Sequence, residues 1–162
     1  QYGDWQSGGL VVAAASEPGR LVTNGMSQYS RNERNANSAI VVGITPDDYP
    51  GHPLAGIALQ RRLEEHAFEL GGSTYNAPGQ LVGDFLADRP SQSLGTVQPS
   101  YTPGVQLGDL SLSLPDYAIA AIREALPAFD KQINGFAMAD AVLTKRAPHP
   151  RFGLSAKRII KA

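Results

Sequence analysis

The polar residues between Asn24 and Ile44 are the part of this chain whose residue types and spacing best suit ligand binding. The stretch NGMSQYSRNERNANSAIVVGI places two clusters rich in asparagine, together with two arginines, beside apolar runs. Arginine offers a forked set of donors that matches carboxylate or phosphate, and asparagine offers both donors and acceptors. Two interpretations follow. The stretch is either a hydrogen-bonded turn network or a ligand-facing surface with Arg31 or Arg34 as the charged anchor. If residues 28–36 formed a helical turn, the two arginines would lie on the same face of that turn.

Other residue types that could do chemistry lack the necessary spacing. His52, His66 and His149 form no HExxH pair, so we expect no metal site. No serine sits in a GxSxG turn. Adjacent Glu64 and Glu65 point different ways on a helix, and we expect both to face water. No GxGxxG or GxxxxGK[ST] cradle for phosphate is present, and we assign no catalytic residue.

The composition fits one globular domain with an uneven charge distribution. The chain has 162 residues, a net charge of −1 and no cysteine, which fits a cytoplasmic protein. No apolar run approaches the roughly 20 residues of a membrane span. Six of the 14 basic residues and no acidic residue lie in 145–162, so residues 1–144 hold 8 basic and 15 acidic residues. The basic end could be a nucleic-acid arm, but the acidic body would repel a phosphate backbone.

Strands are expected in the first third of the chain. The apolar run at 9–16 predicts a buried strand, and a turn signal at 17–20 followed by Leu-Val-Thr at 21–23 predicts a hairpin. Asn24-Gly25 is typical of a further turn. The β-branched run at 38–44 predicts another strand, and the proline-rich segment 45–53 predicts irregular backbone.

Helices are expected later in the chain. The apolar spacing over 54–70 predicts a helix, and a second should begin near Leu114 with Ser113 as its cap and a kink at Pro127. A short apolar segment at 81–87 fits either a strand or a helix, and 136–144 fits a last strand. Residues 88–113, rich in Pro, Ser, Gly and Thr, show no period and predict a functional loop or an interface arm. The fold class is therefore α+β, with a mixed or antiparallel sheet, two main helices and a single domain.

Long stretches of the chain resemble a family of largely uncharacterised bacterial FAD-dependent dehydrogenases. The resemblance rests on GGLVVAAASEPGRLVTNGMSQYSRNERNANSAIVVGI and on three later segments in the same order: APGQLVGDFLADRPS, SLGTVQPSYTPGVQLGDL and LPDYAIAAIREALPAFDKQINGFAMADAVLT. It covers about residues 8–144. Gln6-Ser7 replaces the family's Cys-Pro. Lys145-Arg146-Ala147-Pro148 stands where the family continues with Gly-Val-Glu-Thr-Arg-Thr, so residues 1–7 and 145–162 depart from the family at the two ends.

The resemblance implies a particular place for this domain. In that family the matching region is a substrate-side domain inserted into an FAD-binding Rossmann domain, whose fingerprint this sequence lacks. The resemblance therefore implies FAD for the family, but no cofactor for this chain alone. It implies a cofactor contact at Gly8 and Gly9 only when an FAD domain is supplied. It also implies a flavin- or substrate-facing surface made of Asn24, Gly25, Met26, Ser27, Arg31, Asn35 and Asn37.

The expected function is that of a binding module which is not catalytic alone. Its expected partners are a small anionic or planar ligand, an FAD-domain chain or a second copy of itself, because a face built to meet an FAD domain would favour a homodimer when left open. The alternative is an oxidoreductase component that is active only with a separate FAD-binding chain. Neither a membrane nor nucleic acid is an expected partner.

Overall fold

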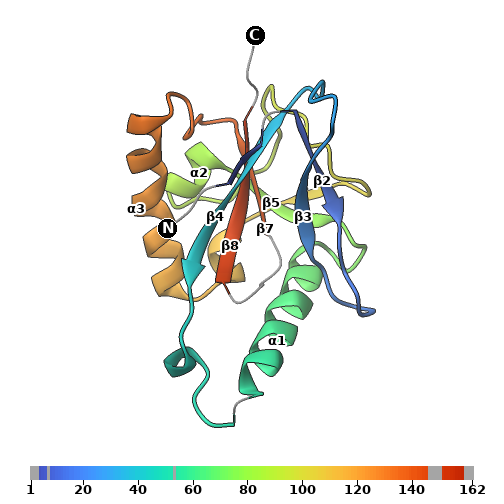
Figure 1. The fold of residues 1–162 in the computed structure, drawn as a ribbon, viewed down its shortest axis with the longest axis vertical. Coiled ribbons are helices and arrows are strands. Elements are labelled where there is room, and N and C mark those ends of the chain that lie inside the picture. Colours follow the sequence, from blue (N-terminus) through green and yellow to red (C-terminus); the bar gives the residue numbers. More distant parts are fainter. Residues whose placement is uncertain (1–3, 7, 53, 146–150, 159–162) are drawn as a thin grey trace.

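The structure of this chain, a computed structural model, describes residues 4–6, 8–52, 54–145 and 151–158 (Figure 1). Its elements run in the order β1 (Asp4–Gln6), β2 (Gly9–Ala13), β3 (Thr23–Ser27), β4 (Ala36–Gly43), η1 (Pro46–Asp48), α1 (Ala55–Leu70), β5 (Ala77–Leu81), α2 (Val82–Leu86), β6 (Val105–Leu107), η2 (Leu110–Ser113), α3 (Asp116–Gln132), β7 (Val142–Lys145) and β8 (Arg151–Arg158). Here η marks a short 3-10 helix.

The strands form two sheets. Six of them make one mixed sheet in the order β1-β4-β8-β7-β5-β6, in which only β5 and β6 run parallel. Strands β2 and β3 make a separate antiparallel hairpin. The two long helices, α1 and α3, lie at different places around the six-stranded sheet, with α3 at the left of Figure 1 and the hairpin at the right. The predicted α+β class, with two main helices, is confirmed.

Two apolar clusters hold these layers together. The larger cluster packs α3, α2 and the sheet around fully buried side chains such as Phe85, Ile122 and Leu143. The smaller cluster, which includes Val11 and Ala67, lies between the hairpin, α1 and β5. The hairpin therefore has its own contact with the body of the protein, apart from the main core. Within the described residues, no helix is long and apolar enough to cross a bilayer.

The predicted hairpin is present, but its second strand is shifted along the sequence. Asn24 and Gly25 pair with Val12 and Val11 inside β3, so the turn expected at Asn24-Gly25 is wrong. Gly25 is suited to this strand because its missing side chain leaves space that Asn37 fills. The connection between the two strands lies at 14–22 instead.

Four local expectations also differ from the structure or gain detail. Ser113 does not cap α3: its hydroxyl donates to the Leu110 carbonyl, and Pro115 holds the cap position. Pro127 lies inside α3, and the kink expected there stays a prediction. The ambiguous segment 81–87 is divided between the end of β5 and α2. Glu64 is buried rather than solvated, since it lies beside Leu63 on the inward side of α1.

The two segments expected to lie outside regular structure both contribute to it. Residues 88–113, called the arm below, contain β6 and η2. Residues 151–158 form β8 between β4 and β7, so this part of the basic end is a sheet strand and not a free arm.

Candidate functional site

The predicted site residues gather where the hairpin meets the start of β4. Asn37, buried on β4, extends its side chain toward the hairpin, and its Nδ2 donates to the carbonyls of Leu10 and Met26 at 3.3 Å each. One amide thus binds both strands of the hairpin, the Leu10 carbonyl on β2 and the Met26 carbonyl on β3. Asn37 fixes the position of the hairpin on the six-stranded sheet.

Three glycines make room for this contact. A Cβ on Gly9 would lie 2.0 Å from Asn37 Nδ2, and one on Gly25 would lie 2.6 Å from Asn37 Oδ1. Gly8 has a left-handed backbone (φ 64°), and a Cβ there would lie 2.2 Å from the Arg31 carbonyl oxygen. The protein's own atoms therefore fill the space that these glycines leave. Gly8 and Gly9 do not by themselves offer an open cradle that fits FAD.

Asn35 connects the same region to the arm. Its Nδ2 donates to the Gln98 carbonyl at 2.8 Å, and its backbone carbonyl accepts from Gly9 N at 2.8 Å. Its Oδ1 is buried and has no hydrogen-bond partner among the described residues. Asn35 and Asn37 thus behave as internal fasteners, which is the role that the turn-network interpretation gave them.

Residues 26–34, called the rim below, project from the fastened hairpin. Met26 is 48% exposed and Tyr29 is fully exposed, and Ser27, Arg31 and Arg34 also face water. Arg31 has a left-handed backbone (φ 50°), and this segment forms no helical turn, so the two arginines are not held on one helix face. Asn24 lies at the base of the rim, with Nδ2 3.7 Å from Met26 Sδ.

The nine predicted residues therefore separate into two layers. The inner layer is buried or half-buried and binds the chain's own backbone, and it consists of Gly8, Gly9, Gly25, Asn35 and Asn37. Met26, Ser27 and Arg31 belong to the outer layer, with Asn24 between the two. Only the outer layer can meet a ligand without rearrangement. The Arg31 guanidinium of this layer suits an anion, and the exposed ring of Tyr29, which also lies in the rim, suits a planar group.

A second polar centre, which the sequence reasoning missed, surrounds Lys145. This side chain is only 2% exposed, and its Nζ donates to the carbonyls of Leu63 (2.6 Å) and Ser113 (2.7 Å). Burial lowers the pKa of Lys145 to about 7, and the charge of nearby Glu64 opposes part of that shift. The one signal in the sequence is its position directly after an apolar run, whereas its charge groups it with the basic end at 145–162.

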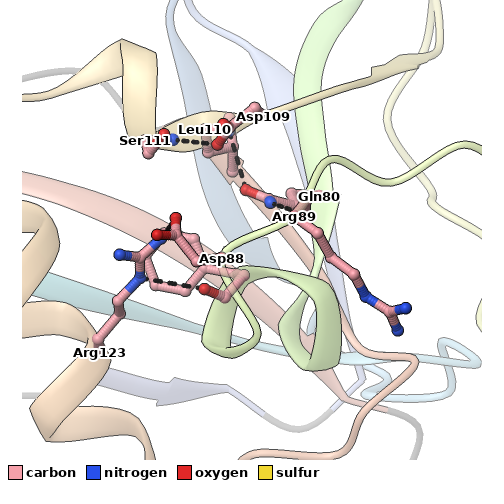
Figure 2. A network of polar contacts seen from close by, with 8 residues as sticks. Gln80, Asp88, Arg89, Asp109, Leu110, Ser111 and Arg123 are labelled. Atoms are coloured by element: carbon pink, nitrogen blue, oxygen red, sulfur yellow. Dashed lines mark hydrogen bonds and ion pairs between the residues drawn. The ribbon is translucent and has the colours of Figure 1, made fainter.

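A third polar centre fixes both ends of the arm to β5 (Figure 2). Gln80 is fully buried; its Nε2 donates to the Arg89 carbonyl at 2.7 Å, and its Oε1 accepts from Leu110 N at 2.8 Å. Beside it, Arg123 donates to the Phe85 carbonyl and pairs with Asp88 at 2.5 Å. Apart from the Arg123–Asp88 ion pair, these contacts use backbone partners, which indicates a structural role.

No constellation for metal or acid–base chemistry joins these three centres. Across residues 8–52 and 54–145, no three side chains of His, Asp or Glu come close enough to hold a metal ion. The rim carries arginines without a nearby acid or base of shifted pKa.

The comparisons with known proteins agree with the resemblance seen in the sequence. Residues 6–147 match the family described as FAD-dependent protein, C-terminal domain-like. A protein of Clostridium beijerinckii described as uncharacterized is 55% identical over 138 residues, a match that covers 85% of this chain. The same match covers 26% of that relative, so the chain spans about a quarter of its length. The chain belongs to the FAD-dependent protein, C-terminal domain-like family.

Proposed function

We propose that this domain is the substrate-side part of an FAD-dependent oxidoreductase and that it acts by binding, without redox chemistry of its own. Family membership supports the link to FAD. The relative is about four times as long as the matched region, which leaves ample length for an FAD-binding domain elsewhere in that protein. The flavin would supply the electron transfer, and this domain would supply part of the surface that orients the molecule to be oxidised or reduced.

The observation that carries the proposal is the contrast between the fixed base of the rim and its exposed tip. Asn37 and Asn35 fasten both ends of the segment through buried hydrogen bonds. Between them, Met26 and Tyr29 remain exposed although both are large apolar side chains. An exposed aromatic group on a fixed base costs little entropy when it binds, which is typical of recognition surfaces.

The chemistry of the rim defines the ligand class. Arg31 and Arg34 provide charge-assisted donors for carboxylate or phosphate oxygens. Tyr29 provides a face for stacking on a planar ring. A small anionic or planar ligand, or the phosphate-bearing face of a bound flavin on a partner domain, meets both requirements.

The first experiment separates a binding module from a catalytic one. We would purify the 162-residue chain, record its flavin absorbance, and titrate it with FAD. We expect no stoichiometric flavin in the purified protein, because Gly8 and Gly9 are closed by the chain's own atoms. A yellow protein that retains one FAD per chain through gel filtration would contradict the proposal.

A second experiment tests the alternative, an oxidoreductase component that needs a separate FAD-binding chain. This alternative has a specific reason: the match covers only 26% of the relative, so most of that protein is available as the separate FAD-binding part. We would mix this chain with the remaining part of the Clostridium beijerinckii protein, loaded with FAD, and follow flavin reduction by NADH or NADPH. The catalytic alternative is supported if reduction occurs only in the mixture and is weakened by Arg31→Gln. The control variant Arg62→Gln, at an exposed position on α1, should not weaken it.

The same rim supports self-association. An exposed apolar surface that normally faces another domain tends to be covered when that domain is absent. We expect a concentration-dependent mass by light scattering, shifted toward monomer by Tyr29→Ser. A mass equal to one chain at all concentrations would exclude the homodimer.

A further inference from the structure

Lys145 joins four elements that are far apart in the sequence. Its Nζ donates to the Leu63 carbonyl on α1 and to the Ser113 carbonyl at the end of η2. Its own carbonyl accepts a 2.7 Å bond from Thr23 Oγ1 on β3, and that hydroxyl is fully buried. We call Lys145, Thr23, Leu63, Glu64 and Ser113 the Lys145 junction. It is the point where β7, α1, η2 and the hairpin are bonded together.

The junction contains one acidic group near the amine. Glu64 is buried on α1, and its Oε1 accepts from Gln60 Nε2 at 2.9 Å. Its charge raises the pKa of Lys145, whereas burial, the larger effect, lowers that pKa to about 7. No ionisable side chain comes from the parts of β3 and η2 that form the junction, which are Thr23 on β3 and residues 110–113 of η2. On β8, uncharged Leu154 lies opposite Lys145 in register, between Gly153 and Ser155.

The number of hydrogen bonds that the Lys145 amine can donate depends on whether the amine is protonated. A neutral amine has two N–H donors, which match the two carbonyls that lie within 2.7 Å of Nζ. An ammonium group has three donors and a full charge, and the low dielectric of a buried site penalises that charge. Proton uptake therefore favours any opening that lets water reach Nζ.

We propose that the Lys145 junction is a proton-controlled latch, which is closed while Nζ is a neutral amine and is loosened by protonation, so that the β2–β3 hairpin separates from α1 and η2. The hairpin is the element to move because few links join it to this region: the Thr23 hydroxyl, the Leu21 N bond to the Glu64 carbonyl, the exposed ion pair of Glu17 with Arg61 on α1, and the smaller apolar cluster. Of the junction residues, only Leu63 belongs to the main core around α3.

The direction of the effect follows from proton linkage. An open junction exposes Lys145 to water, where its pKa returns toward 10.5, while in the closed junction it is about 7. Between these two values the open form binds more protons than the closed form. The opening constant should therefore rise about tenfold for each unit that the pH falls between roughly 9.5 and 7.5, and level off below 7. This latch does not depend on the proposed function, since no flavin or ligand takes part.

The first test is direct titration of the wild-type chain. Lysine labelled with 13C at Cε gives resonances for the four lysines of the sequence, and the Lys145→Met spectrum identifies that of Lys145. We expect the Lys145 resonance to titrate with a midpoint near 7. A Lys145 midpoint at its ordinary value of 10.5 would overturn the latch, and this measurement on the wild type does not require a folded variant.

The second test locates the opening, and it uses the absence of natural cysteine. Val22→Cys places a buried thiol in the residue directly before β3, and Ala125→Cys places a buried thiol in α3. Labelling rates, each corrected with a free thiol at the same pH, are measured from pH 9.5 to 7. We expect Val22→Cys labelling to accelerate about tenfold per unit of falling pH, and Ala125→Cys labelling to accelerate less.

Two further variants complete the second test. Adding Lys145→Met should remove the pH dependence of Val22→Cys labelling, whereas adding Lys131→Met, on the exposed end of α3, should leave it unchanged. Equal rates at Val22→Cys and Ala125→Cys at every pH would mean that the whole protein opens, and would overturn the latch. A pH dependence that survives Lys145→Met would overturn it as well.

Discussion

The rim and the arm look alike in sequence and differ completely in the structure. Both are polar segments without hydropathy period, at 26–34 and 88–113. The arm is fastened along its length: Gln80 binds both of its ends, Gln98 accepts from Asn35, Ser100 accepts from Val11 N, and Tyr101 donates to the Tyr75 carbonyl.

The rim is fastened only at its two ends. It carries its large side chains outward, whereas the arm buries Val97 and Tyr101. A polar segment of this chain is ordered where buried side chains from other elements bind its backbone. The rim, whose middle lacks such contacts among the described residues, is therefore the better candidate for binding a ligand.

The largest effect is expected when the arm loses its main anchor. Gln80→Ala leaves Leu110 N and the Arg89 carbonyl without partners in a buried site. We expect a loss of about 2 to 4 kcal/mol in the free energy of unfolding, measured by urea denaturation with circular dichroism. Gln106→Ala, at an exposed position within the arm, is the matched control. If the two variants are equally stable, the arm is not anchored by Gln80.

A smaller loss is expected at the base of the rim. In Gly9→Ala the new methyl group would lie 2.0 Å from Asn37 Nδ2, so the fastening amide must move. We expect a loss of about 2 kcal/mol, as for other overpacked sites. Gly43→Ala is the control, since nothing lies within 4 Å of a Cβ at that position. A melting temperature of Gly9→Ala as high as that of Gly43→Ala would show that the base is not tightly closed.

Removal of the amide itself should cost slightly less. Asn37→Ala leaves the Leu10 and Met26 carbonyls without this donor, and we expect a loss of about 1 to 2 kcal/mol. Exposed Asn32→Ala should have no measurable effect. In the double variant with Gly9→Ala the losses should not add, because the atom that the methyl group strikes is gone. Additive losses would contradict a direct contact.

The smallest effect on stability is expected at the tip of the rim. Tyr29→Ser removes a fully exposed ring and should change the free energy of unfolding by less than about 0.5 kcal/mol. The same change should weaken binding to the FAD-bearing part of the relative, measured by isothermal titration calorimetry. Tyr75→Ser is a less suitable control because its ring packs on Phe68, so exposed Asn32→Ala is used again. Unchanged affinity would place the binding surface elsewhere.

Sequence reasoning found the elements of the fold more reliably than the roles of polar side chains. Apolar spacing located α1 and α3, and the runs of β-branched residues located β2 and β4. It missed the burial of Glu64 and the importance of Lys145, because both partners of the Lys145 amine are backbone carbonyls from other elements. A backbone carbonyl carries no sequence signal, so these contacts could not be read from residue types.

The candidate site shows the same division between residues. The sequence singled out Asn35 and Asn37 as residues that need hydrogen-bond partners, and Arg31 and Arg34 as residues that suit an anion. It could not separate the fastening residues from the exposed ones, since an asparagine that binds a ligand and one that binds backbone have the same chemistry. Burial distinguishes them, and burial depends on where the hairpin lies on β4.

The sequence by itself determined the α+β class, the two long helices, the hairpin and the family, because hydropathy period, turn residues and motif order are local properties of the chain. Only the tertiary structure decided that the arm is fastened, that the rim is exposed, that residues 151–158 enter the sheet and that Lys145 is buried. Each of these depends on contacts between residues tens of positions apart. Such contacts arise from the packing of whole elements, and local sequence does not specify their geometry.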